Sequence, residues 1–244
     1  MKVLGIIPAR YLSTRLEGKP LADICGKPMI QRVYEQAKIA LGSVLVATDD
    51  QRIVDAVKAF GGQVTMTAAE HTTGTSRCLE AYQNSEIEVD VVVNIQGDEP
   101  LLEPQQLEEI VNCFDDKTVD FATLVFPNAE ELRDGNGVYV ALDKNLNASW
   151  FSRSVIPHMH GIERNEWDKT HQFYKHVGMY AYTPKALVEF SKMEQTTCEK
   201  AESLEQLRWL ENGNRIRVGI TKHRTIAVDT IEDLERVRQL IQQK

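Results

Sequence analysis

Residues 3–21 read VLGIIPARYLSTRLEGKPL, an apolar run that passes directly into a short, cation-rich loop. The run 3–7 is typical of a buried strand, and Pro8 is expected to end its hydrogen-bonding ladder. The loop that follows holds Arg10, Arg15 and Lys19 within ten residues. Backbone N–H groups and cations in such a loop can bind phosphate oxygens, although a solvated basic loop is the alternative.

Apolar strands alternate with helical patterns along the first half of the chain. We expect strands at 2–7, 43–48, 63–66, 89–95 and 121–125, and helices at 28–40, 50–60, 75–84 and 104–114. This alternation predicts an α/β fold with right-handed crossovers and a mostly parallel sheet. Ligands of such sheets bind beyond the carboxyl ends of the strands. Segments 8–19, 48–49 and 96–99 should therefore surround one crevice.

The middle of the chain breaks this rhythm. Between residues 128 and 182 the helical period fades, and short β-like stretches stand at 138–142, 148–151 and 176–182. The pattern predicts an antiparallel excursion from the main sheet. Regular structure then resumes with helices at 184–192, 200–212 and 231–242 and a strand at 215–221. We expect residues 1–244 to form a single domain.

Composition excludes several classes of protein. A chain of 244 residues with 42% hydrophobic content can bury one sizeable core, and its net charge of −8 argues against a polymeric nucleic acid as partner. No apolar run reaches the length of about 20 residues that spans a bilayer, and no signal peptide is recognisable, so we expect a cytoplasmic protein. The four cysteines (Cys25, Cys78, Cys113 and Cys198) form no Cys-x-x-Cys pair and are expected to stay reduced.

Two aspartates are candidates for holding a divalent cation. Asp98 lies in the stretch NIQGDEP at 94–100, directly after an expected buried strand. Magnesium in proteins usually takes one or two carboxylates together with substrate phosphate. A turn or helix cap is the alternative role for Asp98. Asp229 has the same ambiguity, because Asp-Thr-x-x-Asp before an apolar helix is also a capping arrangement.

The loop sequence closely resembles the start of the 3-deoxy-manno-octulosonate (KDO) cytidylyltransferases. The resemblance rests on RYLSTRLEGKPL at 10–21 and GKPMI at 26–30. It continues in order through ATD at 47–49, HTTGTSR at 71–77, NIQGDEP at 94–100, FSRSVIP at 151–157, HVGMY at 176–180, ESLEQLR at 202–208 and VDTIEDL at 228–234. These motifs cover essentially the whole chain.

The resemblance implies a Rossmann-like nucleotidyltransferase fold in which the antiparallel segment at 128–182 helps to form a homodimer and carries sugar-binding residues. It implies transfer of a cytidylyl group from CTP to a 2-keto-3-deoxy sugar acid, for lipopolysaccharide synthesis, with Mg²⁺ as cofactor. The implied residues are Arg10, Arg15 and Lys19 for catalysis; Ala9, Arg10, Lys19, His71, Gly74 and Gln96 for the nucleotide; Arg77, Arg153, His176, Tyr180 and Gln206 for the sugar; and Asp98 and Asp229 for the metal. No dedicated general base is evident.

Three positions depart from the usual pattern of the family. Glu17 stands where proline is usual, Ser76 where an acidic residue is usual, and Tyr139 where a lysine is usual. Because Ser76 and Tyr139 lie in segments expected near the acceptor, the sugar can be KDO or its 8-amino-8-deoxy analogue. Enzymes that activate sialic acids or sugar phosphates, and a non-catalytic nucleotide-binding module, remain alternatives.

Overall fold

A computed structural model describes residues 1–12, 16–128, 132–135, 137–224 and 226–243. The chain divides into two compact units, one made of residues 1–108 with 225–244 and the other of residues 109–224. The prediction of a single domain stays a prediction, because two compact units can still fold together. None of the helices in the described part of the chain is long and apolar enough to span a bilayer.

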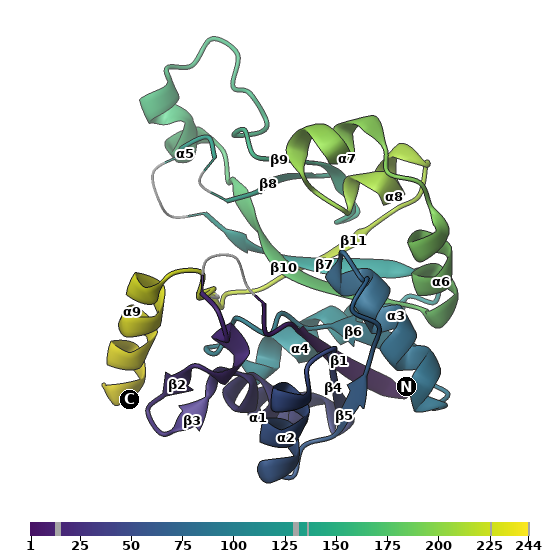
Figure 1. Cartoon of the computed structure of the whole chain (residues 1–244). Coiled ribbons are helices and arrows are strands. Elements are labelled where there is room, and N and C mark those ends of the chain that lie inside the picture. Colours follow the sequence, from purple (N-terminus) through teal and green to yellow (C-terminus); the bar gives the residue numbers. More distant parts are fainter. Residues whose placement is uncertain (13–15, 129–131, 136, 225, 244) are drawn as a thin grey trace. The chain divides into compact units, whose positions relative to one another are not determined.

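The first unit contains a parallel sheet, with strands in the order β6, β1, β4, β5 (Figure 1). Its strands are β1 (Val3–Ala9), β4 (Val44–Thr48), β5 (Val64–Met66) and β6 (Val91–Asn94). Its connecting helices are α1 (Met29–Leu41), α2 (Gln51–Ala59) and α3 (Gly74–Ser85). The α/β class with strand–helix alternation is confirmed.

Pro8 does not end the first strand, contrary to the expectation from sequence. β1 continues through Pro8 and Ala9, which pair in register with Ala47 and Thr48 of β4. The reason is the alternation of backbone groups in a parallel ladder. Ile6 accepts from Ile95 on the β6 side, so Pro8, two residues on, faces the same side, where the pairing with β6 has already ended at Asn94. The missing N–H of Pro8 therefore breaks no ladder bond.

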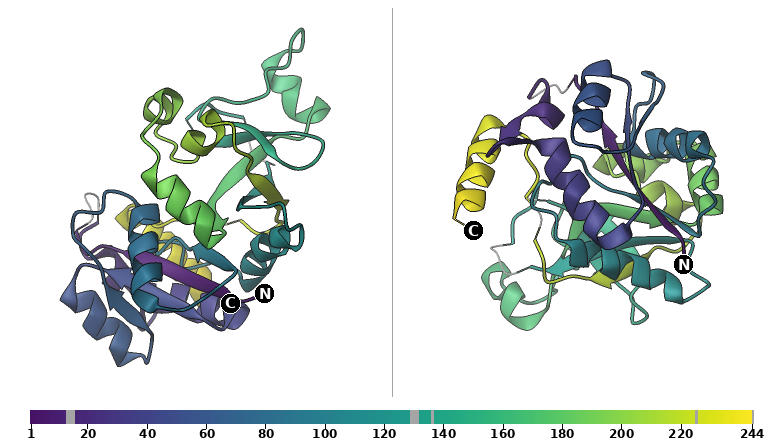
Figure 2. Two further views of the ribbon diagram at one scale, coloured as in Figure 1. Left: turned by 90° about the vertical axis from the view of Figure 1, so that its right-hand side faces the viewer. Right: turned by 90° about the horizontal axis from the view of Figure 1, so that it is seen from below.

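The carboxyl-terminal helix α9 (Ile231–Gln242) returns to the beginning of the chain. Its Leu234 and Val237 are buried in one core cluster with Ile24 and Met29. Two views show α9 beside the hairpin formed by β2 (Asp23–Ile24) and β3 (Lys27–Pro28) (Figures 1 and 2). This packing carries the residues just before α9 to the 3₁₀ helix at Lys19–Leu21.

The second unit is mostly antiparallel. Strand β7 pairs with β10, β10 with β8, and β8 with β9, all antiparallel, whereas β11 runs parallel to β7. The strands are β7 (Phe121–Pro127), β8 (Tyr139–Leu142), β9 (Ala148–Ser152), β10 (Tyr174–Tyr182) and β11 (Arg217–Ile220). The antiparallel excursion predicted for 128–182 is therefore present, although its role in a dimer stays a prediction.

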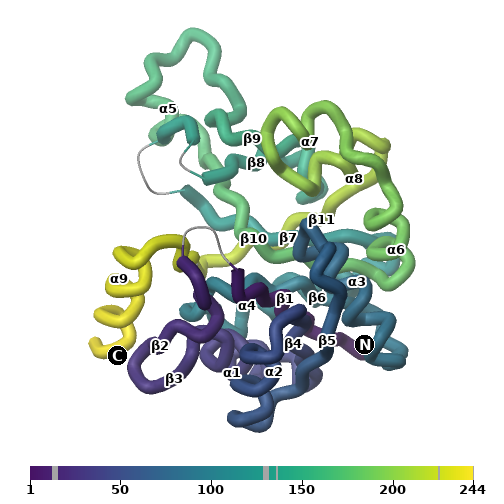
Figure 3. The backbone as a smooth tube through the Cα atoms, in the orientation of Figure 1, coloured from purple at the N-terminus to yellow at the C-terminus, as the bar shows by residue number. Residues whose placement is uncertain are grey.

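The helices of the second unit differ from the sequence prediction at two places, at residues 167–170, where no helix is expected, and at residues 200–212. Helix α4 (Pro104–Asn112) crosses the boundary between the units, and α5 (Trp167–Thr170) and α6 (Pro184–Lys192) follow. The single helix predicted at 200–212 is wrong. Two short helices, α7 (Thr197–Glu202) and α8 (Leu207–Glu211), replace it because Ser203 adopts a left-handed conformation with φ of 53°. Helix α8 contacts β9, and Glu202 at the end of α7 accepts a hydrogen bond from Ser152 of β9 (Figure 3).

Candidate functional site

A cavity of about 330 Å³ lies at the carboxyl ends of β1 and β6 in the first unit. Its lining is Pro8, Ala9, Arg10, Leu12, Lys19, Pro20, Gln96, Gly97 and Asp98. The structure thus brings together five of the residues that the sequence points to for the nucleotide and metal, namely Ala9, Arg10, Lys19, Gln96 and Asp98. The backbone of two loops, together with the cationic side chains of Arg10 and Lys19, lines this cavity, which is large enough for a small anionic ligand.

Two glycines shape this cavity. Gly18 has φ of 68°, a left-handed conformation that turns the chain so that Lys19 can open the 3₁₀ helix. A Cβ on Gly97 would lie 3.0 Å from the carbonyl oxygen of Pro8, so only glycine lets the loop after β6 approach β1 this closely. The Arg52 guanidinium lies 3.3 Å from the centre of the Tyr11 ring and holds the start of the cationic loop against α2.

Lys19 joins the two candidate metal ligands. Its ammonium nitrogen lies 2.6 Å from Oδ2 of Asp98 and 3.3 Å from Oδ1 of Asp229. Asp229 reaches this point because the Val228 N–H donates to the Asp98 carbonyl oxygen at 2.8 Å. A capping box between Thr230 and Asp233 then starts α9. The capping role proposed for this motif is therefore filled by Thr230 and Asp233, which leaves the Asp229 carboxylate to face Lys19.

This pair of carboxylates fits a magnesium ion. The carboxylates of Asp98 and Asp229 come from segments far apart in sequence, and both are paired with the Lys19 ammonium. Both side chains keep partial access to solvent. Among the described residues no group of three or more histidine, cysteine or acidic side chains gathers as a metal site. Two protein carboxylates with substrate phosphate is the set of ligands that magnesium commonly uses.

The segment before α3 supplies the remaining nucleotide candidates. A Cβ on Gly74 would lie 3.4 Å from Cγ of Pro8, so the start of α3 adjoins the end of β1. Beside it, the buried Asn94 has a side-chain oxygen without a hydrogen-bond partner among the described residues. The His71 ring pairs with Glu80; burial raises the pKa of Glu80, but hydrogen bonds from Ala68 and His71 outweigh it and lower that pKa.

Arg77 is engaged inside the first unit. Its side chain is fully buried, and it donates to Oδ2 of Asp49 at 3.0 Å and to Oγ1 of Thr67 at 2.6 Å. Its Nε has no partner among the described residues. The role of Arg77 in binding the sugar stays a prediction. Its hydrogen bonds to Asp49 and Thr67 connect α3 to the ends of β4 and β5. Thr48 and Asp49, expected at the crevice, do not line the 330 Å³ cavity.

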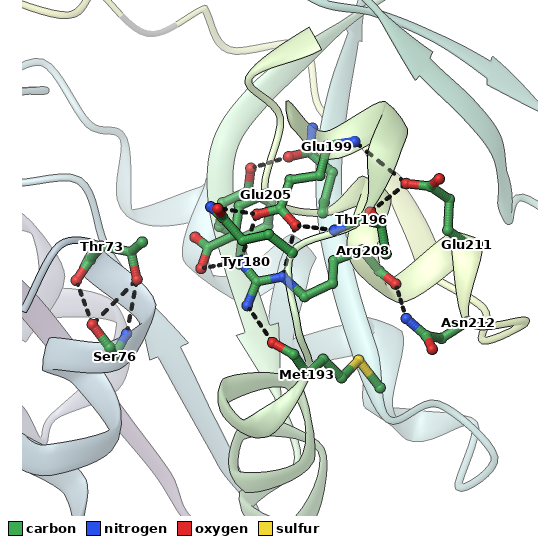
Figure 4. A network of polar contacts seen from close by, with 12 residues as sticks. Thr73, Ser76, Tyr180, Met193, Thr196, Glu199, Glu205, Arg208, Glu211 and Asn212 are labelled. Atoms are coloured by element: carbon green, nitrogen blue, oxygen red, sulfur yellow. Dashed lines mark hydrogen bonds and ion pairs between the residues drawn. The ribbon is translucent and has the colours of Figure 1, made fainter. Parts of the chain in front are cut away.

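Two further candidate positions in the first unit are Arg15 and Ser76. Arg15 lies outside the described residues, so its predicted catalytic role has no structural counterpart here. The hydroxyl of Ser76 donates to the Thr73 carbonyl oxygen at 3.1 Å, within the first turn of α3 (Figure 4). Ser76 thus serves the local N-cap that Thr73 provides.

Two of the sugar candidates meet in the second unit. The Tyr180 hydroxyl donates to Oε1 of Gln206 at 3.0 Å. Gln206 is only 2% exposed, and its Nε2 has no hydrogen-bond partner among the described residues. Burial, with a further contribution from the charge of Glu205, raises the pKa of Tyr180, so the phenol stays protonated. An unsatisfied buried amide donor next to a neutral hydroxyl suits an oxygen-rich ligand.

Arg153 is anchored to the end of α7. Its Nε donates to the Glu202 carbonyl oxygen at 2.7 Å, and its Nη2 donates to the Ser203 carbonyl oxygen at 3.3 Å. The Glu202 carboxylate in turn accepts from the Ser152 hydroxyl at 2.6 Å and from the Arg153 backbone N–H at 2.9 Å. The guanidinium remains exposed, so the remaining N–H groups of Arg153 can reach a carboxylate.

His176 lies between aromatic rings in β10. Its ring nitrogen is 2.8 Å from the Thr123 hydroxyl, and its ring centroid is 5.2 Å from that of Phe151 and 5.4 Å from that of Tyr180. Burial lowers the pKa of His176 to about 3, so the imidazole is neutral at physiological pH. It can exchange hydrogen bonds at this position but brings no positive charge to it.

We expect His176 to make the protein sensitive to acid. Because the pKa of His176 is lower in the folded than in the unfolded chain, stability is complete above about pH 6.5 and is lost as the pH falls toward 3. The loss should reach about 1.4 kcal/mol per pH unit within this window. Urea unfolding of wild type and His176→Phe between pH 4 and 8 measures it. Equal slopes in the two proteins would show that His176 does not carry the effect.

A polar network that the sequence did not reveal holds α7 and α8 together (Figure 4). Arg208 binds Glu199 in a bidentate pair, with Nη2 to Oε1 at 2.5 Å and Nε to Oε2 at 2.8 Å. Their side chains are only 8% and 5% exposed. Hydrogen bonding to Glu199 raises the pKa of Arg208. Glu211 accepts from the Thr196 hydroxyl and from two backbone N–H groups at the start of α7.

Tyr139 belongs to the core of the second unit. It is fully buried in a cluster with Leu132, Trp167 and Phe173, and its hydroxyl bonds to both backbone groups of Arg133 at 3.2 Å. Its side chain is therefore not offered to a ligand in this structure, which differs from the expectation that Tyr139 shapes the acceptor site.

A family model described as "Cytidylyltransferase" matches residues 4–216. The chain is 56% identical over 242 residues to a 3-deoxy-manno-octulosonate cytidylyltransferase of Parabacteroides distasonis, covering 97% of this chain and 96% of the relative. It is 51% identical to that of Phocaeicola vulgatus over 249 residues, covering 100% and 99%.

A solved structure is also similar over the full length. A CMP:2-keto-3-deoxy-manno-octonic acid synthetase complexed with CTP superposes with a TM-score of 0.92 at 42% identity and covers 100% of this chain and 99% of that one. A 4-diphosphocytidyl-2C-methyl-D-erythritol synthase of Anaerococcus prevotii, at 11% identity and a TM-score of 0.65, shares the fold alone. The chain belongs to the 3-deoxy-manno-octulosonate cytidylyltransferase family.

Proposed function

We propose that the protein transfers the cytidylyl group of CTP to the anomeric hydroxyl of KDO, giving a CMP-sugar and pyrophosphate. The observation that carries the proposal is the cavity at the ends of β1 and β6, where two cations and an aspartate face one space. Membership of the family and the CTP complex of the similar structure support the choice of nucleotide. In the reaction the hydroxyl oxygen bonds to the α-phosphorus. The bond between the α-phosphorus and the oxygen that bridges to the β-phosphate breaks, pyrophosphate leaves with the electron pair, and the hydroxyl proton passes to water.

The residues of the first unit suit the triphosphate. Phosphoryl and nucleotidyl transfer depend on positioning and on neutralising charge more than on a covalent residue. Arg10 and Lys19 line the cavity, and we assign both to the phosphates, with Arg15 as a further predicted contact. Gln96 and the backbone at Ala9 would bind the nucleoside together with the segment at His71 and Gly74. The buried Asn94 oxygen is an acceptor that the sequence did not single out.

We propose that Asp98 and Asp229 hold magnesium against the phosphates. When bound, the ion would offset the charge that builds up on the phosphate oxygens and lower the pKa of the attacking hydroxyl. Asp98 and Asp229 themselves supply hard oxygen ligands, 2.6 and 3.3 Å from the same ammonium nitrogen, and the Val228 hydrogen bond ties their backbones together.

The second unit offers groups suited to a sugar acid. We assign the exposed guanidinium of Arg153 to the carboxylate, and Tyr180, Gln206 and His176 to hydroxyls.

Gln206→Leu removes the unpartnered amide donor while keeping similar volume. It should raise KM for the sugar about 10-fold or more, with KM for CTP unchanged, because one hydrogen bond is lost from the acceptor alone. Steady-state kinetics with each substrate varied in turn measures the split, and an equal rise in both KM values would contradict the assignment.

A pyrophosphate-release assay tests the function itself. CTP and magnesium are incubated with KDO, 8-amino-8-deoxy-KDO, a sialic acid and a sugar phosphate in separate reactions. The proposal expects release with the KDO-type sugars and little with the others. Release with the sialic acid or the sugar phosphate would assign the chain to those reactions, and no release with any acceptor would support a non-catalytic nucleotide-binding module.

The same assay decides between KDO and its 8-amino analogue through kcat/KM at fixed CTP. We propose KDO, which the names of the relatives support. The buried position of Tyr139 means that its departure from the family pattern is explained by packing and need not alter sugar choice. A homodimer and a cytoplasmic location are further parts of the proposal, and sedimentation equilibrium tests the dimer.

A further inference from the structure

Lys19 forms ion pairs with both candidate metal ligands, Asp98 and Asp229. Lys19 occupies the point on which the two carboxylates converge, 2.6 Å from one and 3.3 Å from the other. Its side chain is 15% exposed, less than the 28% and 36% of the two aspartates. Lys19 is therefore the least exposed member of this ion-pair cluster.

The charges of the cluster limit what can bind there. With Lys19 in place, two carboxylates and one ammonium carry a net charge of −1. The ammonium neutralises repulsion between Asp98 and Asp229. A divalent cation that used the same oxygens would stand within a few ångströms of the ammonium, and like charges at such spacing repel strongly when they are partly shielded from water.

We propose that Lys19 is a built-in placeholder for the metal, an ammonium that holds Asp98 and Asp229 together and leaves them when a divalent cation binds. This inference rests on the proposed magnesium site and deepens it. The departing ammonium stays within the cavity lined by Arg10 and Lys19, where the nearest new anion is the triphosphate itself. Metal binding and triphosphate binding are thereby coupled through one side chain, because each is favoured by the same movement of Lys19.

Three features of the site suit Lys19 to this role. Gly18, in its left-handed conformation, sets the backbone direction of the residue, so the side chain alone has to move. The lysine stem is flexible, and its charge is a compact point without the fixed planar geometry of arginine. Asp98 lies after β6 and Asp229 before α9, and both are tied by the Val228 backbone hydrogen bond, so they stay in place when the ammonium leaves.

Titration with Mn²⁺ in the absence of nucleotide and sugar tests the placeholder. Binding is measured by electron paramagnetic resonance and calorimetry for wild type, Lys19→Met and Lys19→Arg, with Lys27→Met as the matched control. Lys27 also pairs with a carboxylate, at 2.6 Å from Glu35, but lies outside the cavity. Lys19→Met should bind Mn²⁺ about 10-fold more tightly than wild type, because the competing cation is gone. Lys19→Arg and Lys27→Met should remain near wild type.

Two further readouts separate this role from a merely structural one. Without metal, Lys19→Met should melt at a lower temperature than wild type, and Mn²⁺ should restore its melting temperature. The factor by which CTP tightens Mn²⁺ binding should also be smaller in Lys19→Met. Equal Mn²⁺ affinity in wild type and Lys19→Met, or tighter binding that survives in Lys19→Met/Asp98→Asn, would overturn the placeholder. Because the titration contains no sugar, it can fail while cytidylyl transfer stands.

Discussion

Asp98→Asn is expected to lower kcat by about 100-fold or more at saturating CTP and magnesium, the size of effect seen when one charge-stabilising group is removed from an active site. The substitution keeps the shape of the side chain and removes its negative charge. The amide can still accept from Lys19, now 2.6 Å from Asp98, so the fold of the loop should persist. Binding of CMP, which lacks the outer phosphates, should change little. Steady-state kinetics and calorimetry measure both quantities.

Asp90→Asn is a matched control for this experiment. Asp90 precedes β6, whereas Asp98 follows it, and the Asp90 carboxylate accepts only from the Lys2 backbone N–H in the bonds described, at 2.7 Å. Its substitution should leave kcat within about twofold of wild type, as expected for a surface position far from the reacting atoms. A kcat of Asp98→Asn close to that of wild type would remove Asp98 from the metal site.

Arg208→Met should lower the free energy of unfolding by about 3–5 kcal/mol, because it leaves the Glu199 carboxylate buried without its partner. Both side chains are less than a tenth exposed, and the pair joins two helices of six and five residues that are too short to be stable alone. Gln206 immediately precedes α8, so loss of the pair should also raise KM for the sugar. Urea unfolding, followed by circular dichroism, measures the first effect.

Lys169→Met provides the comparison for an exposed ion pair in the same unit. Lys169 and Glu166 lie 2.8 Å apart with both side chains exposed, and such pairs contribute little to stability because water and salt screen them. The double variant Glu199→Leu/Arg208→Met should recover most of the lost stability, because no charge is then left buried. If Arg208→Met is no more destabilising than Lys169→Met, the pair does not hold α7 and α8 together.

Local signals made several elements predictable from sequence. Helix α9 was expected at 231–242 and found at Ile231–Gln242, since Thr230 and Asp233 form a capping box before a regular apolar period. Helix α6 also matched, with Thr183 as its N-cap and Pro184 in its first turn. The rule that ligands gather beyond the carboxyl ends of parallel strands placed Lys19 and Asp98 at one cavity, where the structure has them.

Features that depend on distant partners were not predictable in the same way. The break between α7 and α8 arises at Ser203, whose left-handed backbone no local composition signals. The burial of Arg77 depends on Asp49 and Thr67, which lie in loops after two other strands. Lys19 was assigned to phosphates alone, because its pairing with Asp229 joins residues from opposite ends of the chain.

The most direct measurement of the central claim is product analysis by ³¹P NMR and mass spectrometry. Purified protein is incubated with CTP, magnesium and KDO, and the products are followed over time beside Asp98→Asn. The account predicts that CMP-KDO and pyrophosphate appear in equal amounts, that neither forms when KDO is omitted, and that Asp98→Asn forms both at least about 100-fold more slowly. Pyrophosphate without a CMP-sugar, or a CMP-sugar formed equally fast by Asp98→Asn, would contradict it.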